Sequence, residues 1–355
     1  SVILQMADAR LGAIEDFPFV EPPDRSQVRD GLRLLKELGA LADPRQGEAE
    51  GQRLTKTGRL LAKLPVDPRL GRMLVEAGRR GCAWDVLPVV AALAIPDVRE
   101  RPTEKQAEAD ALHRRFWSET GAANAARGEA HGDRDASDIA AIWRLWDYLR
   151  NQRNELSGNA FRRMCRDEYL NFLRIREWQD LVSQLREIIG ELDLDTQASN
   201  ADADTRRARA RQPRQASAHT PDWDAVHTAI LAGLLSHVGL RDERSTVPKT
   251  QQRRGRRPMA EYLGARGARF AIQPGSAAAK AEPPLAMAVE LVETTRLWAR
   301  TVAPITAEQV EAVGGHLITR QYSEPRWSVR GGQCVADERV LLLGVPIVEI
   351  GRAHV

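Results

Sequence analysis

The segment Phe161–Leu185 constrains the fold of this chain more than any other stretch, because it carries two apolar stripes at helical spacing. Apolar residues that recur every three or four positions indicate a helix with one buried face. One stripe contains Phe161, Met164, Cys165, Tyr169 and Phe172, and the other contains Trp178, Leu181, Val182, Leu185, Ile188, Ile189 and Leu192. The spacing predicts a pair of core helices with a solvated outer face. Arginines beside the first stripe form a basic edge.

Composition limits the class of protein. The 355 residues fit two or three domains, and 43% hydrophobic with 28% charged residues is typical of a globular protein that buries real cores. No run approaches 18 apolar residues, so we expect no membrane contact. The three cysteines are far apart, so neither a disulfide framework nor a zinc site is expected. A reducing cytoplasm is the expected compartment.

The sequence pattern near the N-terminus predicts a small helical domain over residues 24–66. The apolar spacing of Asp24–Leu38 indicates a helix that Gly39 ends, and Thr55 is placed to cap a second, short helix. Two helices and a short wing are typical of a winged helix. Residues 1–23 are apolar and then rich in proline, and we expect them to be a disconnected tail of a preceding domain.

A larger helical domain is expected over residues 67–195. Asp67-Pro68 is a strong helix start, and Ser137 is placed to cap another helix. Trp143 and Trp146 lie on one face of that second helix. Paired tryptophans can stack on bases, but their spacing among aliphatic residues favours a core position.

The composition of residues 196–222 predicts a disordered linker. Residues 191–204 carry five acids and no base, whereas residues 205–215 carry five arginines and no acid. Alanine, serine, glutamine and proline fill the rest, which leaves too little apolar surface to fold. The basic half either adds non-specific RNA contact by charge or is a spacer neutralised by the acidic half; both alternatives stay open.

The remaining part, residues 223–348, predicts a β-rich domain. Short strands with glycine punctuation follow a helix after Trp223, and Glu261–Ile272 is typical of a hairpin. About five such strands fit an OB-like barrel, a fold whose strands and loops commonly bind single-stranded nucleic acid. The predicted fold class is therefore α+β and mostly helical, with two helical domains before the barrel.

Catalytic motifs are missing from this sequence. No Gly-Lys dipeptide occurs, so there is no GxxxxGK[ST] phosphate cradle, and no Asp-Glu-Ala-His box is present. The seven histidines show no spacing typical of a metal site or a catalytic triad. We expect no catalytic, metal-binding or cofactor-binding residues, and no ATP hydrolysis by this chain alone.

Several motifs in a consistent order resemble one family. Tyr169-Leu170-Asn171, Arg176-Glu177-Trp178 and Gln184-Leu185 resemble the helical ratchet domain of DEAH-box RNA helicases of the HrpA type. Leu4–Asp24 is similar to the family's junction after the second RecA-like motor domain, and Leu54–Leu74 to the exit of its winged helix. Glu261–Ala277 and Glu290–Arg300 resemble its OB-fold, and His316–Trp327 continues in the same order.

The resemblance implies that this chain is the accessory half of a bacterial ATP-dependent RNA helicase. Residues 1–23 would be the tail of the missing second motor domain, and the winged helix would mainly pack against the motor. The whole protein would bind ATP and Mg²⁺ in its RecA-like motor domains and move single-stranded RNA from 3′ to 5′. The sequence also lacks an initiator Met, and its end, EIGRAHV at residues 349–355, is encoded by a common sequencing adapter. We therefore expect a fragment with a non-native end.

The resemblance and the local charge pattern together define candidate RNA contacts. Basic side chains can bind the phosphate backbone of RNA. They occur near turns, on one strand face and along the edge of the ratchet domain. The candidates are Arg162, Arg163, Arg166, Arg266, Arg269, Ser276, Lys280, Arg296 and Arg300. The basic loop 241–257 is an additional candidate arm. Phe270 alternates with Arg269 along a strand, which places it on the opposite, core face.

Two alternatives to this function stay open. In the first alternative, the chain is a stand-alone RNA-binding protein that never had a motor. In the second, it is a scaffold whose helical domains bind a protein partner. The resemblance favours the helicase accessory half with two partners, single-stranded RNA and the motor domains of the same polypeptide.

Overall fold

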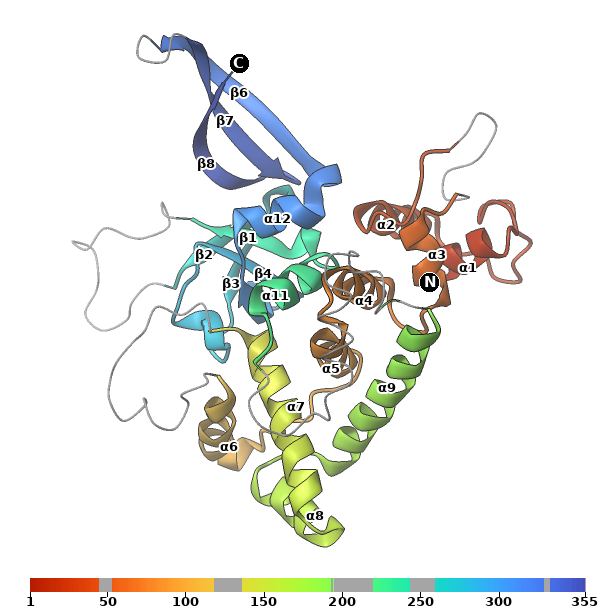
Figure 1. The fold of residues 1–355 in the computed structure, drawn as a ribbon, viewed down its shortest axis with the longest axis vertical. Coiled ribbons are helices and arrows are strands. Elements are labelled where there is room, and N and C mark those ends of the chain that lie inside the picture. The colour runs from red at the N-terminus through yellow and green to blue at the C-terminus, as the bar shows by residue number, and fades with distance from the viewer. Residues whose placement is uncertain are drawn as a thin grey trace, which may run out of the picture. The chain divides into compact units, whose positions relative to one another are not determined.

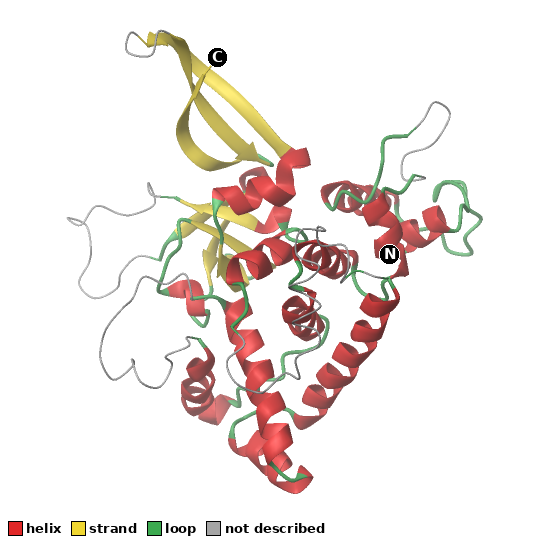
Figure 2. Cartoon of the chain, viewed as in Figure 1, coloured by secondary structure: helices red, strands yellow, loops and turns green. Residues whose placement is uncertain are grey.

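The computed structural model describes residues 1–44, 53–117, 136–192, 194, 220–242, 259–328 and 333–354. These residues form two compact units (Figure 1). The helical unit comprises Ser1–His113 and Ile142–Gly233, and the barrel unit comprises Arg114–Ala141 and Leu234–Val355. Figure 2 shows the helices and strands; all strands of the described residues, β1 to β8, belong to the barrel unit.

The helical unit begins with α1 (Val2–Asp8), α2 (Arg25–Glu37) and α3 (Lys56–Lys63). As expected, Thr55 caps α3 by accepting a hydrogen bond from the N–H of Gly58, and Gly39 follows α2 with a φ of 64°. An isolated bridge joins Leu41 to Leu54 beside these helices. Two helices and this bridge match the arrangement expected of a winged helix.

The first helix departs from the expectation of a disconnected tail. α1 packs against α3, and its side chains Leu4 and Met6 are 2% and 5% exposed. Apolar residues that find a partner surface within the same unit leave the solvent, because burial of that area is favourable. Residues 1–8 are therefore part of the folded helical unit.

Further helices complete the described part of this unit. Their bounds are α4 (Pro68–Arg80), α5 (Ala83–Leu93), α6 (Gln106–His113), α8 (Gly158–Asp167), α9 (Phe172–Glu191) and α11 (Trp223–Leu231), and most of α7 (Asp138–Glu155) joins them. Asp67 caps α4 and Pro68 occupies its first turn, as predicted. α9 packs on α5, and α11 packs on α4. The contacts of α11 group it with the helical unit, whereas the boundary expected at residue 223 places it with the barrel.

The tryptophans of α7 pack among other aromatic rings. Trp146 lies 5.1 Å from Trp178 of α9, and Trp143 lies 5.9 Å from Trp223 of α11, measured between ring centroids. Both side chains are half-buried. Their rings pack on other side chains of the unit, as their spacing predicts, but neither residue is fully buried.

Five strands of the barrel unit close into a barrel in the order β1-β2-β3-β5-β4. They are β1 (Val238–Arg241), β2 (Glu261–Gly264), β3 (Arg269–Ile272), β4 (Leu285–Glu293) and β5 (Leu297–Pro304). Only the β3–β5 pairing is parallel among the pairs of this barrel. Phe270 is 2% exposed and stacks on Tyr262 at 5.5 Å, so its predicted core position is confirmed. Gly239 makes room for this ring, since a Cβ there would stand 2.3 Å from Phe270 Cζ.

A second sheet follows the barrel. After α12 (Ala307–Gly314), strands β6 (Ile318–Ser328), β7 (Gln333–Leu342) and β8 (Val345–His354) pair antiparallel. The residue pattern of Val340–Leu343 by itself indicates only a short strand, whereas β7 extends from Gln333 to Leu342. The segment expected to be non-native, 349–355, forms the end of β8 up to His354.

Two expected features lie outside the described residues. The linker predicted over 196–222 is described only from Thr220, and the basic loop 241–257 only at Arg241 and Asp242. Within the described part of the chain, no helix has the length and apolarity needed to cross a membrane.

Candidate nucleic-acid interface

One face of the barrel brings together arginines from separate strands. Arg269, on β3, places its Nη1 2.8 Å from Asp242 Oδ2 and 3.6 Å from Glu261 Oε2. Arg296, in the turn before β5, places its Nη2 2.7 Å from Glu261 Oε1. Glu261, on β2, therefore holds two candidate arginines beside each other.

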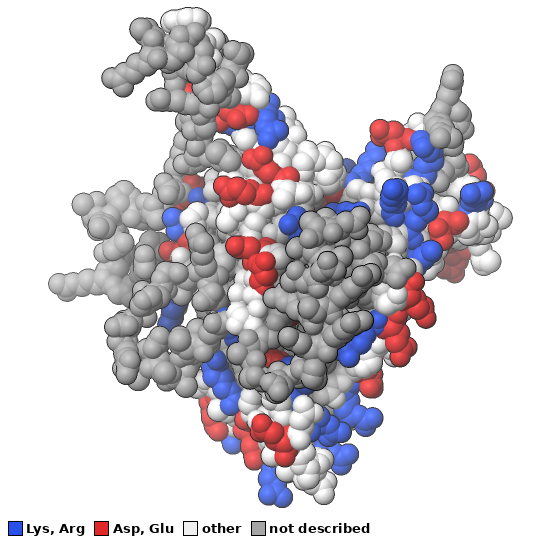
Figure 3. Space-filling view, in the orientation of Figure 1, with Lys and Arg blue, Asp and Glu red and all other residues white. Residues whose placement is uncertain are grey.

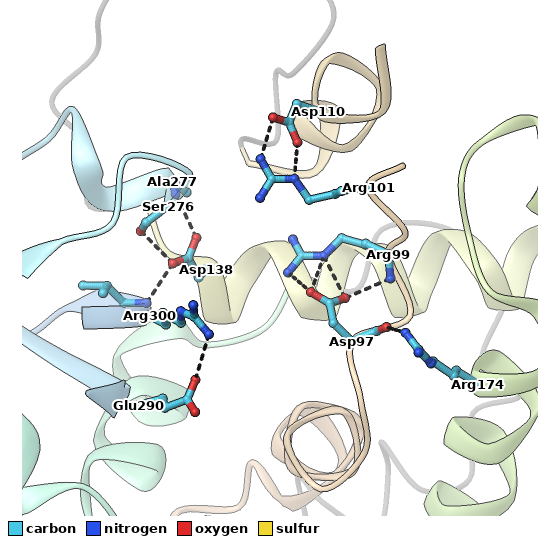
Figure 4. A network of polar contacts seen from close by, with 11 residues as sticks. Asp97, Arg99, Arg101, Asp110, Asp138, Arg174, Ser276, Ala277, Glu290 and Arg300 are labelled. Atoms are coloured by element: carbon cyan, nitrogen blue, oxygen red, sulfur yellow. Dashed lines mark hydrogen bonds and ion pairs between the residues drawn. The ribbon is translucent and has the colours of Figure 1, made fainter. Parts of the chain in front are cut away.

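The alternation expected along β5 is present. Leu297 and Ala299 pack toward the barrel core, whereas Arg296 and Arg300 lie on the opposite side. The Arg296 guanidinium stands 5.4 Å from the centre of the Trp298 ring. Arg300 Nη1 lies 3.8 Å from Glu290 Oε2 of β4 (Figure 4).

The charges on this face are balanced by carboxylates. The side chains of Arg269, Arg296 and Arg300 are 57%, 37% and 46% exposed, and each is within ion-pair distance of an acid. Exposed ion pairs stabilise a protein by at most about 1 kcal/mol. Exchange of such a carboxylate for another anion therefore costs little, and the neighbouring acids reduce the net positive charge of this face.

Two further candidates lie in turns of the barrel unit. Arg266 is exposed and occupies the left-handed region, with φ 59° and ψ 25°, while its N–H donates to the carbonyl oxygen of Leu343 at 3.2 Å. Lys280 is exposed at the end of the 3₁₀ turn Ala277–Ala279. Both side chains are open to solvent, as a phosphate contact requires.

Ser276 is a correction to the predicted set. Its side chain is not at the surface: the residue is 5% exposed, and its hydroxyl donates to Asp138 Oδ2 at 2.6 Å. The same oxygen accepts from the N–H of Ala278. The Ser276 hydroxyl already bonds Asp138 and the N–H of Ala278 inside the barrel unit, so we remove Ser276 from the candidate RNA contacts.

The ratchet candidates lie on α8. Phe161 and Cys165 face the core, and Arg162, Arg163 and Arg166 are exposed. The Arg162 guanidinium stands 5.0 Å from the centre of the Phe172 ring. Figure 3 shows basic side chains gathered around the end of the helical unit where α8 lies.

The described residues contain no cluster suited to a metal ion. No group of three His, Cys, Asp or Glu side chains there has the required proximity. Cys82 and Cys165 are buried, and burial raises the pKa of the Cys82 thiol to about 12 and that of Cys165 to about 11. Both thiols are therefore unreactive groups that pack in the interior.

Sequence reasoning missed the acids of this interface. Glu290 faces Arg300 across the β4–β5 pairing, whereas Glu261 and Asp242 reach the other arginines because strand pairing in the barrel brings their segments together. The contacts of Asp138 with the barrel unit were also missed. In the sequence, this residue only follows Ser137 at a predicted helix start. No local signal in the sequence points to these partners.

Three protein-family models match this chain, in the order of the domains described above. Residues 31–66 match the model "Helicase associated domain (HA2), winged-helix", and residues 67–142 match "Helicase associated domain (HA2), ratchet-like". Residues 226–318 match "Oligonucleotide/oligosaccharide-binding (OB)-fold". The ATP-dependent RNA helicase HrpA of Escherichia coli strain K12 is 43% identical over 348 residues, which is 98% of this chain. This chain is homologous to the HrpA-type RNA helicases.

The HrpA homolog of Haemophilus influenzae is 42% identical over 99% of the chain, and the DExH-box ATP-dependent RNA helicase DExH1 of Arabidopsis thaliana is 24% identical over 90%. The chain spans 23% of the length of each of the two HrpA relatives. It contains the helicase-associated winged helix and ratchet-like domain, followed by the OB-fold, of an HrpA-type protein.

Proposed function

We propose that this chain is the RNA-binding accessory half of an ATP-dependent RNA helicase, and that it guides single-stranded RNA past a motor located elsewhere in the whole protein. The observation that best supports this proposal is that Arg269 and Arg296 both form an ion pair with Glu261, which brings two basic side chains together on one barrel face. OB-folds bind single strands on the face of their second and third strands and in the loops after the first and fourth. Arg269 and Arg296 occupy such positions.

The second proposed partner is the pair of RecA-like motor domains of the same polypeptide. The printed names of the HrpA relatives describe ATP-dependent RNA helicases, and those proteins are about four times as long as this chain. ATP and Mg²⁺ would bind in the motor. Movement of RNA from 3′ to 5′ is part of this proposal and rests on the family resemblance.

The barrel face makes a specific prediction about salt. Each phosphate neutralised on a single strand contributes about 0.7 to the slope of log affinity against log salt. We would titrate the full chain into fluorescein-labelled single-stranded RNA at several KCl concentrations. The double variant Arg269→Gln/Arg296→Gln should bind more weakly and lose about 1.4 from the slope magnitude.

A matched control removes two arginines elsewhere. Arg29 and Arg33 are exposed on α2, and Arg33 also has an acidic neighbour, with its Nη1 3.8 Å from Asp30 Oδ1. The variant Arg29→Gln/Arg33→Gln has the same net charge as the barrel variant and should keep the wild-type slope. Equal losses in both variants would indicate general charge attraction and would overturn the proposed path. Unchanged binding in the barrel variant would leave the protein-scaffold alternative standing.

A further inference from the structure

Asp138 joins the first turn of α7 to two separate segments of the barrel unit. Its Oδ2 accepts hydrogen bonds from Ser276 Oγ at 2.6 Å and from the N–H of Val302 at 2.8 Å. Its Oδ1 accepts from the N–H of Ala277 at 2.8 Å. Figure 4 shows the carboxylate between these donors.

The surroundings make this contact strong. Ser137 is 0% exposed, Ser276 is 5% exposed and Ala277 is 7% exposed, so water is largely excluded from the carboxylate's partners. Hydrogen bonds to an ionised acceptor are about twice as strong as neutral ones. The negative charge also stands at the N-terminal end of a helix, where it is favoured.

The two segments held by Asp138 lead directly to candidate RNA contacts. The 3₁₀ turn Ala277–Ala279 ends at Lys280. On β5, Val302 follows Thr301, whose φ of 52° is rare for a β-branched residue, and Arg300 comes just before. A strained backbone position persists only where its surroundings hold it, and the bond from Val302 to Asp138 is such a restraint.

The same helix is fixed at its other end within the helical unit. α7 runs without interruption from Asp138 to Glu155, and its residues from Ile142 onward belong to that unit. Leu145 and Leu149 are 3% and 1% exposed, and the Tyr148 hydroxyl donates to Glu168 at 2.8 Å. The later turns of α7 are therefore anchored among other side chains of the helical unit.

We propose that Asp138 is a positioning residue for RNA binding: it holds Arg300 and Lys280 in their binding geometry and ties that geometry to α7. This inference rests on the RNA-binding function proposed above. A displacement of α7 would then alter how Arg300 and Lys280 present their charges to RNA. Asp138 itself contacts no phosphate, since it is an anion.

The test uses the full chain with Asp138→Asn. This variant keeps the side-chain shape but replaces one acceptor oxygen with an amide NH2, which donates hydrogen bonds instead of accepting them. Hydrogen exchange should become at least about tenfold faster in peptides that contain Ala277 and Val302, because their N–H donors lose a charged acceptor. Exchange in β3, around Phe270, should stay at the wild-type rate. Unchanged exchange at Ala277 and Val302 would overturn the inference directly.

RNA binding supplies the second readout through a double-mutant cycle. Arg300→Gln alone should lower the salt-slope magnitude by about 0.7. Asp138→Asn should lower it by up to about 1.4, because Arg300 and Lys280 both lose their position, and adding Arg300→Gln to it should change little further. Removal of a negative charge by itself strengthens RNA binding, so a loss of affinity cannot arise from net charge. Full additivity of the two substitutions would overturn the positioning role.

The outcomes separate this inference from the proposed function. If Arg300→Gln binds RNA as the wild type does, the proposed contact at Arg300 fails, whereas the exchange data still decide whether Asp138 holds the two segments. If Arg300→Gln weakens binding and Asp138→Asn does not, the function stands and the positioning role fails. Should Asp138→Asn not fold, Ser276→Ala removes a single bond to the same carboxylate and is expected to show a smaller effect of the same kind.

Discussion

The indole N–H of Trp178 donates a hydrogen bond to the carbonyl oxygen of Pro88 over 2.8 Å. Trp178 lies in the middle of α9 and is 1% exposed, and Pro88 lies inside α5. A buried indole needs a partner for its N–H, because an unsatisfied donor costs about 1–3 kcal/mol. This bond therefore specifies how α5 and α9 pack in the helical unit.

Replacement of Trp178 should destabilise the helical unit. We expect Trp178→Ala to lower the free energy of unfolding by about 3–5 kcal/mol, because it leaves a large cavity. Trp178→Phe should cost less, since it fills most of the volume but loses the hydrogen bond. Urea unfolding followed by circular dichroism measures both effects. Trp327→Phe is the control: this residue is 66% exposed, and a cost above about 0.5 kcal/mol there would contradict the burial argument.

Phe270→Ala tests whether this ring serves the barrel core or stacks on bases. Because Phe270 is 2% exposed and packs on Tyr262, we expect a loss of about 3–5 kcal/mol in the free energy of unfolding of the barrel unit. The salt slope of RNA binding by the remaining folded protein should not change. Wild-type stability combined with weaker RNA binding at high salt would instead place Phe270 in a stacking role.

Acid should destabilise the helical unit through His227. Burial, aided by the charge of Arg144, lowers the pKa of His227 from 6.5 to about 4. Between these pH values His227 is protonated in the unfolded chain but neutral in the folded chain. The free energy of unfolding therefore decreases as pH falls from about 6.5 to 4. The full effect is about 3 kcal/mol.

Thermal unfolding between pH 7 and 5 measures the His227 contribution. Carboxylates with lowered pKa values, such as Asp97, titrate below this window. Burial also lowers the pKa of His113, which adds a change of the same sign. His227→Gln should flatten the profile relative to the wild type. An identical pH profile in this variant would show that His227 is not the responsible group.

The arginines of α8 should contribute to RNA affinity through charge. Replacing Arg162, Arg163 and Arg166 together with Gln should lower the salt-slope magnitude by about 2, if each neutralises a phosphate. Arg162 also covers Phe172, so its replacement alone should cost about 0.5–1 kcal/mol of stability.

The matched control for α8 is on α2. Arg25, Arg29 and Arg33 are three exposed arginines of one helix, and their replacement by Gln removes the same charge. RNA affinity and salt slope should stay near the wild type in this control. A wild-type slope in the α8 variant would remove the ratchet edge from the RNA path.

Local features of the sequence predicted much of the fold. Thr55, Ser137 and Asp67-Pro68 start helices as expected, because capping depends on atoms within three or four residues. The stripe through Trp178, Val182, Leu185 and Ile189 is buried as predicted, since helical periodicity alone selects one face. The alternation at Arg269 and Phe270 likewise follows from strand geometry.

The tertiary structure decided which of the predicted charges have partners. Ser276 looked like a loop hydroxyl, yet it is buried against Asp138, which is 138 residues away in the chain. Glu261 serves Arg269 and Arg296 only because strand pairing brings β2 beside β3 and the closed barrel brings the turn before β5 next to them. Capping and periodicity act between near neighbours in sequence, so a single chain's pattern carries them. Charge pairing and burial depend on contacts between separate elements, which form only in the folded chain, and no local pattern specifies those contacts.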